Sequence, residues 1–485
     1  MTSAPAGPAE RTTVPVDRPA PHVVVLGGGP GGYEAALVAR RSGARVTLVE
    51  RAGPGGAAVL TDVVPSKTLI ATAEWMTIAE RAGELGIRSE DAGRHVVDLA
   101  RVNARVVELA AAQSADIRTR LVAEGVRLVA GLGRLDGPSR VLVTPWDEGR
   151  GRPPVEALDA DVVLVATGAT PRTLPEALPD GERILTWTQL YGLTELPRRL
   201  VVVGSGVTGA EFAGAYNALG SDVVLVSSRE HVLPGEDADA ARVIEDVFAG
   251  RGMTVLGRSR AVSAERTDDG VRVALADGRV VEGSHCLMAV GSVPSTRDIG
   301  LVEAGVRLTA GGHVEVDRVS RTSVRGVYAA GDCTGVLPLA SVAAMQGRIA
   351  MAHALGDAVV PLDLGTVAAT IFTAPEIATV GASQRSLEEG GGRFVATTLA
   401  LARNPRAKML GIKDGFVKVF AHEASGIVLG GVVVAPRAGE LIFPITLAVS
   451  QRLTVADVAQ AFTVYPSLSG SVAEAARVLR GRMVG

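Results

Sequence analysis

The residues best suited to chemistry near the start of this 485-residue chain form a glycine-rich turn. Gly27, Gly29 and Gly32 have the spacing Gly-x-Gly-x-x-Gly and follow the apolar run 22–26. Glycines at this spacing let the backbone approach a pyrophosphate, whose charge is stabilised at the N-terminus of the helix that follows. Glu50 ends the next apolar run, where an acid would accept hydrogen bonds from a ribose. The pattern predicts a dinucleotide-binding β-α-β unit.

A second turn, Gly204-x-Gly206-x-x-Gly209, has the same context but no acid at the matching strand end. The chain has Ser228 and Arg229 there. The absence of an acid removes a charge that would repel a 2′-phosphate, and an arginine could pair with one. We expect NADPH to be accepted and leave NADH open. The alternative, that Arg229 is merely a solvated surface residue, stays equally open.

Hydrophobic periodicity indicates the elements that must position these turns. Strands are predicted at 22–26, 45–49, 162–166, 199–203, 222–226, 326–330, 416–420 and 426–434, and helices at 33–42, 103–124, 210–219 and 471–479. The β-α-β unit occurs twice, and the pattern changes after about residue 363 to alternating strands followed by helices. Together with the length, this repeat predicts an α/β protein of about three domains.

Composition narrows the class of protein. Aromatic residues make up 3% of the chain and the net charge is −3, which argues against a nucleic-acid partner. No run of about 18 apolar residues is found, so no integral membrane segment is expected. Cys286 and Cys333 are too few for a disulfide framework and favour a reducing, cytoplasmic location. Residues 1–20 are rich in Pro, Ala and Thr and are predicted to form a mobile tail.

Taken in order, five motifs resemble those of the pyridine nucleotide–disulfide oxidoreductases, which include dihydrolipoamide dehydrogenase. They are the two glycine turns, Ala166-Thr167-Gly168, Ala330-Gly331-Asp332 and Tyr465-Pro466-Ser467-Leu468-Ser469. The resemblance covers about residues 21–480. It implies two Rossmann-like domains, for FAD and NAD(P), and an α+β dimerisation domain. The implied limits are 21–187 and 312–362 for the FAD domain, 188–311 for the NAD(P) domain and 363–485 for the dimerisation domain.

The family's redox-active cysteine pair is missing. Its signature, Gly-Gly-Thr-Cys-x4-Cys-x-Pro-Ser-Lys, places Ala58 and Val63 at the two cysteine positions of this chain. The carboxy-terminal His and Glu, which serve thiol chemistry in the family, are replaced by Tyr465 and Gly470. Loss of thiols and base together excludes reduction of lipoamide, glutathione or thioredoxin by the family mechanism.

The parts of the family site that serve the flavin are retained. Lys67 and Glu211 match positions that form an ion pair beside flavin N5, where a cation would stabilise reduced flavin. Two other readings stay open: Lys67 as a surface lysine and Glu211 as an acid favoured by a helix N-terminus. The resemblance places Asp332 at the flavin ribityl or pyrophosphate and the helix starting near Ala340 at the flavin pyrimidine. Further cofactor-binding positions are expected at Thr167, Gly168 and Gly291.

The resemblance is strongest to a cysteine-less branch of NAD(P)H:quinone reductases. It implies that NAD(P)H gives hydride to flavin N5 and that a quinone-type acceptor then takes the electrons. The acceptor could use the vacated disulfide side, lined by Ala58, Val63 and Tyr465 of a partner subunit, or it could follow NAD(P)⁺ out of the nicotinamide side, and both routes stay open. A homodimer is expected, with residues 436–445 and 471–479 as packing surfaces; the alternative, that these segments pack only within their own domain, stays open. No metal site is indicated. Three alternatives stay open: a soluble pyridine nucleotide transhydrogenase, an NAD(P)H oxidase, and a non-catalytic flavin-bound sensor or scaffold.

Overall fold

The first apolar runs of the chain build a sheet of order β17-β6-β1-β2-β3-β4-β5. These elements belong to a computed structural model that describes residues 19–87, 95–145 and 155–484. The strands are β1 (His22–Leu26), β2 (Arg45–Glu50), β3 (Arg127–Leu135), β4 (Arg140–Pro145), β5 (Glu156–Asp159), β6 (Val162–Val165) and β17 (Val327–Ala329). Strands β17 to β3 of this order pair in parallel, and β4 and β5 add an antiparallel edge. Most of the predicted tail, residues 1–18, falls outside the described residues.

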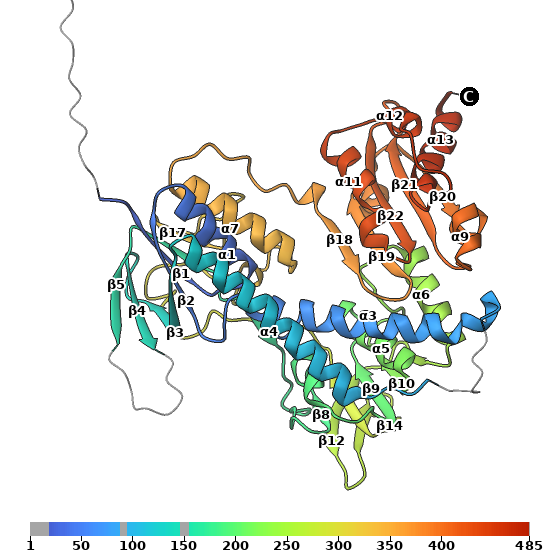
Figure 1. The fold of residues 1–485 in the computed structure, drawn as a ribbon, viewed down its shortest axis with the longest axis horizontal. Helices are drawn as coiled ribbons and strands as arrows, with labels where there is room; N and C mark the ends of the chain where they lie inside the picture. The colour runs from blue at the N-terminus through green and yellow to red at the C-terminus, as the bar shows by residue number, and fades with distance from the viewer. Residues whose placement is uncertain (1–18, 88–94, 146–154, 485) are drawn as a thin grey trace, which may run out of the picture.

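Two helices, α1 (Pro30–Arg41) and α7 (Ala340–Ala354), lie side by side over one face of this sheet (Figure 1). Every residue of β1 is buried, as expected for a strand covered on both faces. The helices approach so closely that a Cβ on Gly347 would collide with the carbonyl oxygen of Gly31. This contact fixes the start of α7 relative to the first glycine turn.

The second sheet repeats the arrangement with the order β11-β10-β9-β15-β8. Its elements are β8 (Ile184–Leu185), β9 (Arg199–Val203), α5 (Val207–Leu219), β10 (Asp222–Val226), α6 (Ala238–Gly250), β11 (Thr254–Leu256) and β15 (His285–Met288). Two small sheets accompany it: β12 (Ala261–Arg266), β13 (Val271–Leu275) and β14 (Val280–Gly283) form one, and β7 (Ala169–Pro171) and β16 (Ser292–Pro294) the other. The second sheet thus begins at β8, and Leu301 and Val306 pack in the core of the first sheet. The domain limits given above remain predictions.

The last unit is an antiparallel sheet of order β18-β19-β22-β21-β20. Its strands are β18 (Ala368–Ile371), β19 (Glu376–Gly381), β20 (Phe394–Ala400), β21 (Phe416–His422) and β22 (Val428–Ala435). Its helices are α8 (Gln384–Glu389), α9 (Pro405–Met409), α10 (Ala438–Leu441), α11 (Phe443–Ser450), α12 (Val455–Gln460) and α13 (Gly470–Val484). Short 3-10 helices are η1 (Ala82–Leu85), η2 (Trp187–Gly192), η3 (Asp332–Thr334), η4 (Leu364–Thr366) and η5 (Leu401–Arg403).

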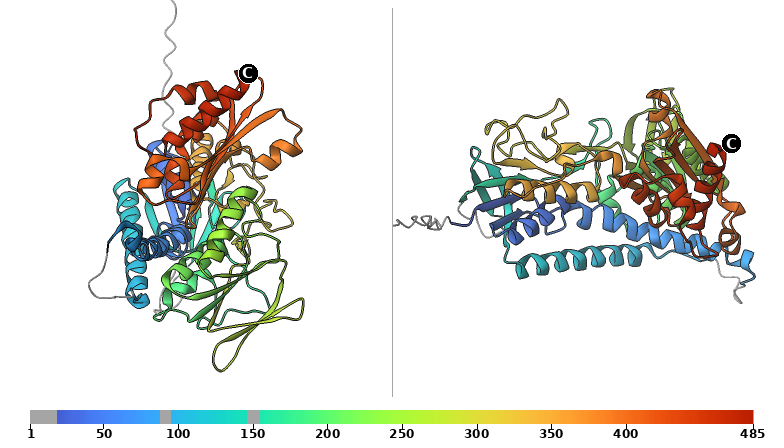
Figure 2. Two further views of the ribbon diagram at one scale, coloured as in Figure 1. Left: turned by 90° about the vertical axis from the view of Figure 1, so that its right-hand side faces the viewer. Right: turned by 90° about the horizontal axis from the view of Figure 1, so that it is seen from above.

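Three helices between β2 and β3 join the units: α2 (Gly56–Leu60), α3 (Val63–Glu80) and α4 (Leu99–Ala123). In Figures 1 and 2, α3 runs from the first sheet to the last unit, with α4 alongside it. Leu69 of α3 belongs to one buried cluster with Phe212 of α5 and Ile371 of β18. The amino-terminal part of α3, which carries Lys67, is therefore held where all three units meet.

Element bounds differ from the predictions mainly at helix starts. The helix predicted at 33–42 begins at Pro30, and that predicted at 210–219 begins at Val207. In both helices, a glycine of the Gly-rich motif lies within the first turn of the helix. Because glycine has a low helix propensity, a sequence pattern places the start of the helix too late. Within the described ranges of the chain, we find no helix that is both long and apolar enough to span a membrane.

Candidate functional site

The first glycine turn leaves open space where a pyrophosphate would lie. Gly27 adopts φ of 100°, and its N–H donates to Val49 O at 2.9 Å. A Cβ on Gly27 would collide with the carbonyl oxygen of Ala166, and one on Gly32 with that of Gly27. Among the described residues, nothing lies within 4 Å of a Cβ placed on Gly29. The turn therefore packs tightly on one side and is open on the side that faces a ligand.

Glu50 is fixed at the end of β2 by the backbone of two loops. Its Oε2 accepts a hydrogen bond from Gly28 N at 2.6 Å, and its Oε1 accepts one from Ala52 N at 2.7 Å. Each carboxylate oxygen retains lone pairs beyond these bonds. The carboxylate is thus oriented at the turn, and its bond to a ribose stays a prediction.

The residues after β6 and β17 meet at the carboxyl ends of these parallel strands. Thr167 Oγ1 is buried and finds no hydrogen-bond partner in the part of the chain that the structure describes. Gly168 has φ of 70° and open space beside its Cα. Burial raises the pKa of Asp332 above its usual range, against a smaller lowering by His313. A buried hydroxyl without a partner and an open glycine fit a polar ligand such as the pyrophosphate and ribityl chain of FAD.

Helix α7 begins at Ala340, as the sequence predicted, and is tied to the same loop. Gln346 of α7 is buried, and its Oε1 accepts a hydrogen bond from Gly331 N at 2.8 Å. Sequence reasoning missed Gln346, because a polar residue inside an apolar helix has no motif of its own. The first N–H groups of α7 are available for a ligand with negative charge.

The second turn reproduces the geometry of the first. Gly204 has φ of 112°, and its N–H donates to Val226 O at 2.9 Å. Gly209 packs against the carbonyl of Gly204, whereas Gly206 has open space beside its Cα among the described residues. Gly291, with φ of 91°, faces open space in the same way at the end of β15. The predicted nucleotide positions of the second unit are therefore brought to one strand edge.

After β10, one serine is fixed by hydrogen bonds, whereas the next two side chains are exposed. Ser227 is buried; its Oγ lies 2.7 Å from Ser205 Oγ and accepts from Arg229 N at 3.1 Å. Ser228 and Arg229 are exposed. Arg258 N donates to Arg229 O at 2.7 Å, and the Arg258 guanidinium pairs with Glu230. A second arginine thus lies beside Arg229. Sequence reasoning missed Arg258 because it is distant from Arg229 along the chain.

Lys67 and Glu211 form an ion pair between α3 and α5. Lys67 Nζ lies 2.8 Å from Glu211 Oε2, and Lys67 is also 4.9 Å from the centre of the Phe372 ring. Glu211 is 3% exposed, and its Oε1 accepts a hydrogen bond from Phe372 N at 2.8 Å. Phe372 follows β18 of the last unit, so the pair is held by all three units. A half-buried cation in fixed position is suited to stabilising negative charge on a neighbouring group.

A carboxyl group that sequence reasoning missed adjoins this pair. Asp62 is half-buried, and desolvation raises its pKa to about 6. The charge of Lys67 opposes this shift, whereas those of Glu211 and Asp332 add to it. The only signal in the sequence is an acid directly before Val63 and five residues before Lys67.

The two thiols are not placed for redox chemistry. Cys286 and Cys333 are both completely buried. Burial raises the pKa of Cys286 to about 12 and that of Cys333 to about 11, so neither is a thiolate at neutral pH. Ala58 and Val63 lie in α2 and at the start of α3, one turn or more before Lys67.

Tyr465 is exposed within a single chain. Its side chain is 83% exposed, and its neighbours Phe462 and Val464 are 106% and 77% exposed. Phe443 and Leu447 of α11, within or next to the predicted packing surface 436–445, are also exposed. Phe462, Val464 and Tyr465 lie within four positions of the chain, and exposed apolar side chains grouped in this way are typical of an interaction surface.

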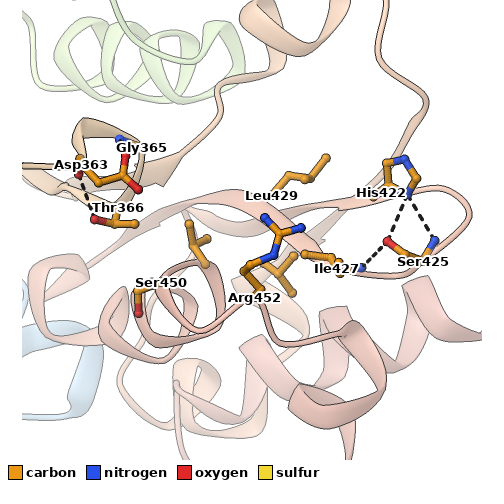
Figure 3. Close-up of a pocket in the computed structure, with 11 residues that line it drawn as sticks. Asp363, Gly365, Thr366, His422, Ser425, Ile427, Leu429, Ser450 and Arg452 are labelled. Atoms are coloured by element: carbon orange, nitrogen blue, oxygen red, sulfur yellow. Dashed lines mark hydrogen bonds between the residues drawn. The ribbon is translucent and has the colours of Figure 1, made fainter. Parts of the chain in front are cut away.

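A pocket of about 440 Å³ in the last unit is separate from all these residues. Figure 3 shows it between η4, the turn that joins β21 and β22, and the end of α11. Its lining includes Asp363, His422 and Arg452, with Ser425 N donating to His422 Nδ1 at 3.2 Å. None of the predicted site residues lines it.

Comparison with known proteins shows the family of the chain. A family model described as pyridine nucleotide-disulphide oxidoreductase matches residues 21–347, and the dimerisation-domain model of that family matches residues 367–476. A Mycobacterium tuberculosis protein named NAD(P)H dehydrogenase (quinone) is 55% identical over 94% of this chain and 93% of its own. A Zymomonas mobilis dihydrolipoyl dehydrogenase is 33% identical over 95% of this chain and 98% of its own.

Solved structures agree as well. The crystal structure of LpdA from Mycobacterium tuberculosis has a TM-score of 0.89 and 54% identity, and the match covers 95% of this chain and 99% of that one. The Escherichia coli flavoprotein disulfide reductase RclA, at 22% identity and a TM-score of 0.83, shares the fold. Two nucleotide-binding units, a carboxy-terminal dimerisation domain and the retained motifs all agree: the chain belongs to the pyridine nucleotide–disulfide oxidoreductase family.

Proposed function

We propose that this protein is an NAD(P)H:quinone oxidoreductase that works without a redox disulfide. As a member of its family it is an oxidoreductase that uses FAD and a pyridine nucleotide. One observation carries the proposal: the Lys67–Glu211 ion pair is intact at 2.8 Å, whereas Ala58 and Val63 occupy the cysteine positions. The name of the 55% identical relative, NAD(P)H dehydrogenase (quinone), supports a quinone as the acceptor.

The residues that would hold FAD line the carboxyl edge of the first sheet. Gly27, Gly29 and Gly32 would hold its pyrophosphate, Glu50 a ribose, and Thr167 with Asp332 the chain that leads to the flavin. When bound there, FAD accepts two electrons and a proton from NAD(P)H and passes the electrons to an acceptor. Lys67 would place its charge at the flavin, and Glu211, anchored by Phe372 N, would hold Lys67 in position.

Two copies of the chain would complete the site. Tyr465 and its exposed neighbours lie on a unit whose family model is a dimerisation domain. We propose that the partner subunit's Tyr465 covers the side of the flavin next to Val63, where an acceptor would enter. The homodimer would also bury the exposed Phe443 and Leu447 of α11.

Turnover with different acceptors tests the proposed function. Under anaerobic conditions, the FAD-loaded protein is expected to oxidise NADPH with menadione far faster than free FAD does. With lipoamide or oxidised glutathione, which need a thiol pair, turnover is expected to stay at background. Turnover is measured as loss of NADPH absorbance. If menadione-dependent oxidation does not exceed that of the free-FAD control, the protein does not have the proposed enzyme activity. Rapid lipoamide reduction would refute the disulfide-free mechanism.

Nucleotide preference is expected to depend on Arg229. Arg229→Ala removes a cation from the end of β10, so the KM for NADPH should rise roughly tenfold, as for loss of one charge-assisted contact, while the KM for NADH stays within about twofold. Arg272→Ala removes an exposed arginine of β13 in the same unit and serves as the control. If the ratio of the KM values for NADPH and NADH is unchanged in Arg229→Ala, Arg229 is a solvated surface residue and does not set the nucleotide preference.

A further inference from the structure

Asp62 occupies the capping position of α3 without serving as its cap. It directly precedes Val63, the first residue of the helix, and Asp is among the residues preferred at this position. Among the described residues, however, its carboxyl makes no capping hydrogen bond. Only its main chain contributes, because Asp62 O accepts from Ser66 N at 2.8 Å. The carboxyl group is therefore left for another role.

Charged and titratable groups surround Asp62 from four elements. Lys67 lies one turn along α3, Glu211 comes from α5, Asp332 from η3 and Tyr191 from η2. Tyr191 Oη is buried and has no hydrogen-bond partner among the described residues. Burial, and next the charge of Asp62, raise the pKa of Tyr191. The charges of the ion pair thus act on Asp62, and its partial exposure leaves it in contact with solvent.

Proton balance shows what such a group could supply. Reduction of a quinone to a hydroquinone takes up two electrons and two protons. A reduced nicotinamide supplies both electrons and one proton, so one further proton must come from an acid of the protein or from water. In disulfide-using members of the family a carboxy-terminal His handles protons, and this chain has Tyr465 there instead.

The phenol next to Asp62 is a poor proton donor near neutral pH. Lys67 is engaged in the ion pair with Glu211, and burial with neighbouring negative charge raises the pKa of the Tyr191 phenol, which keeps it protonated. A general acid works best when its pKa lies near the working pH, and for Asp62 the pKa is raised to about 6 by burial. Its position, next to the vacated cysteine position and one turn from Lys67, is the side where the acceptor would enter.

We propose that Asp62 is the acid that protonates the quinone acceptor, an inference that rests on the proposed function. The O–H bond of the Asp62 carboxylic acid breaks as a bond forms between this proton and a quinone oxygen. The electron pair of the broken bond stays on the carboxylate, and water returns a proton to it before the next turnover. Lys67 stabilises the carboxylate that is left.

Replacement of the carboxyl by an amide of the same shape isolates the proton. Asp62→Asn is expected to lower kcat with menadione on the order of 100-fold, the lower range for loss of a general acid. Ferricyanide takes up electrons without protons, so its turnover should fall much less, and the ratio of menadione to ferricyanide turnover is the decisive quantity. Glu80→Gln removes an exposed acid from the far end of the same helix and is the control for loss of one negative charge.

The pH profile gives a second readout. An acid must be protonated to act, so menadione turnover of the unaltered enzyme should fall as pH rises through about 6, the raised pKa of Asp62. The profile of Asp62→Asn should lack this inflection, and Asp62→Glu should restore it in part. A third readout needs no turnover: infrared difference spectra across this pH range should show a carboxylic-acid carbonyl band that Asp62→Asn removes.

The outcomes separate this inference from the proposed function. If the unaltered enzyme does not reduce menadione, the proposed function fails whatever the variant does. If it does, and Asp62→Asn keeps the same menadione-to-ferricyanide ratio and the same pH profile, Asp62 is not the acid. Equal loss with both acceptors, with the infrared band still titrating in the variant, would also overturn the inference. FAD content and thermal unfolding of each variant are measured alongside, so that a folding defect is recognised.

Discussion

Lys67→Met is expected to slow reduction of the enzyme by NADPH by roughly 100- to 1,000-fold, the range seen when one fixed stabilising group is removed from an active site. Lys67 Nζ is held at 2.8 Å from Glu211, which is itself anchored by Phe372 N. Methionine keeps the length and packing of the side chain but removes the cation. Negative charge that develops on the reduced cofactor would then face Glu211 without compensation.

The measurement is the loss of visible flavin absorbance after anaerobic rapid mixing with NADPH. Lys413→Met, which removes an exposed lysine of the last unit, controls for the change in net charge. Glu211→Gln should also slow the reaction, but less, because Lys67 keeps its charge while losing its partner. A rate in Lys67→Met within about twofold of the unaltered enzyme would show that Lys67 does not act at the flavin.

Lys418→Met is expected to lower the free energy of unfolding by about 3–5 kcal/mol, the usual cost of breaking a buried ion pair from one side. The Lys418 side chain is 3% exposed and that of Asp237 is 4% exposed. Lys418 Nζ lies 2.8 Å from Asp237 Oδ2, 2.6 Å from Asp239 Oδ2 and 3.1 Å from Gln384 Oε1. Methionine would leave the Asp237 carboxylate buried without a counter-ion.

The Lys418–Asp237 pair joins two units, so its loss should destabilise the contact between them. Asp237 also caps α6, accepting from Asp239 N at 3.0 Å and Ala240 N at 3.2 Å, whereas Lys418 lies in β21 of the last unit. The pair therefore holds the second unit against the third. Urea unfolding of the single variants and of Lys418→Met/Asp237→Asn measures it. The double variant should recover a large part of the loss, because its buried carboxylate is gone. A loss below about 1 kcal/mol in Lys418→Met would mean that Asp237 stays solvated.

The nucleotide-binding frame could be predicted because its sequence signals are local. β1, β9 and β10 have the predicted bounds, because a strand buried in a parallel sheet is a short apolar run, and a glycine turn also marks the ends of β1 and β9. Helix starts were placed too late where glycines occupy the first turn. The family and the absence of a cysteine pair could also be read from short motifs.

The rest of the site depends on distances along the chain that no local pattern encodes. Lys418 and Asp237 are 181 positions apart, and Lys67 and Glu211 are 144 apart. The ion pair of Lys67 was predicted only through the resemblance to a family, whereas Lys418 has no motif. The raised pKa of Asp62 comes from burial among groups of four elements, which the sequence cannot show. In the proposed homodimer, the surroundings of Tyr465 would come from a second copy of the chain.

The central claim is that electrons leave the flavin directly to a quinone-type acceptor, and the reoxidation of the reduced enzyme tests it most directly. Enzyme reduced with one equivalent of NADPH is mixed anaerobically with menadione, with thio-NAD⁺ or with lipoamide, and the return of flavin absorbance is followed. We predict reoxidation by menadione at a rate no slower than turnover, and none above background with lipoamide. Reoxidation by thio-NAD⁺ at turnover rate, with menadione no faster than it reacts with free reduced FAD, would contradict this account and identify a transhydrogenase.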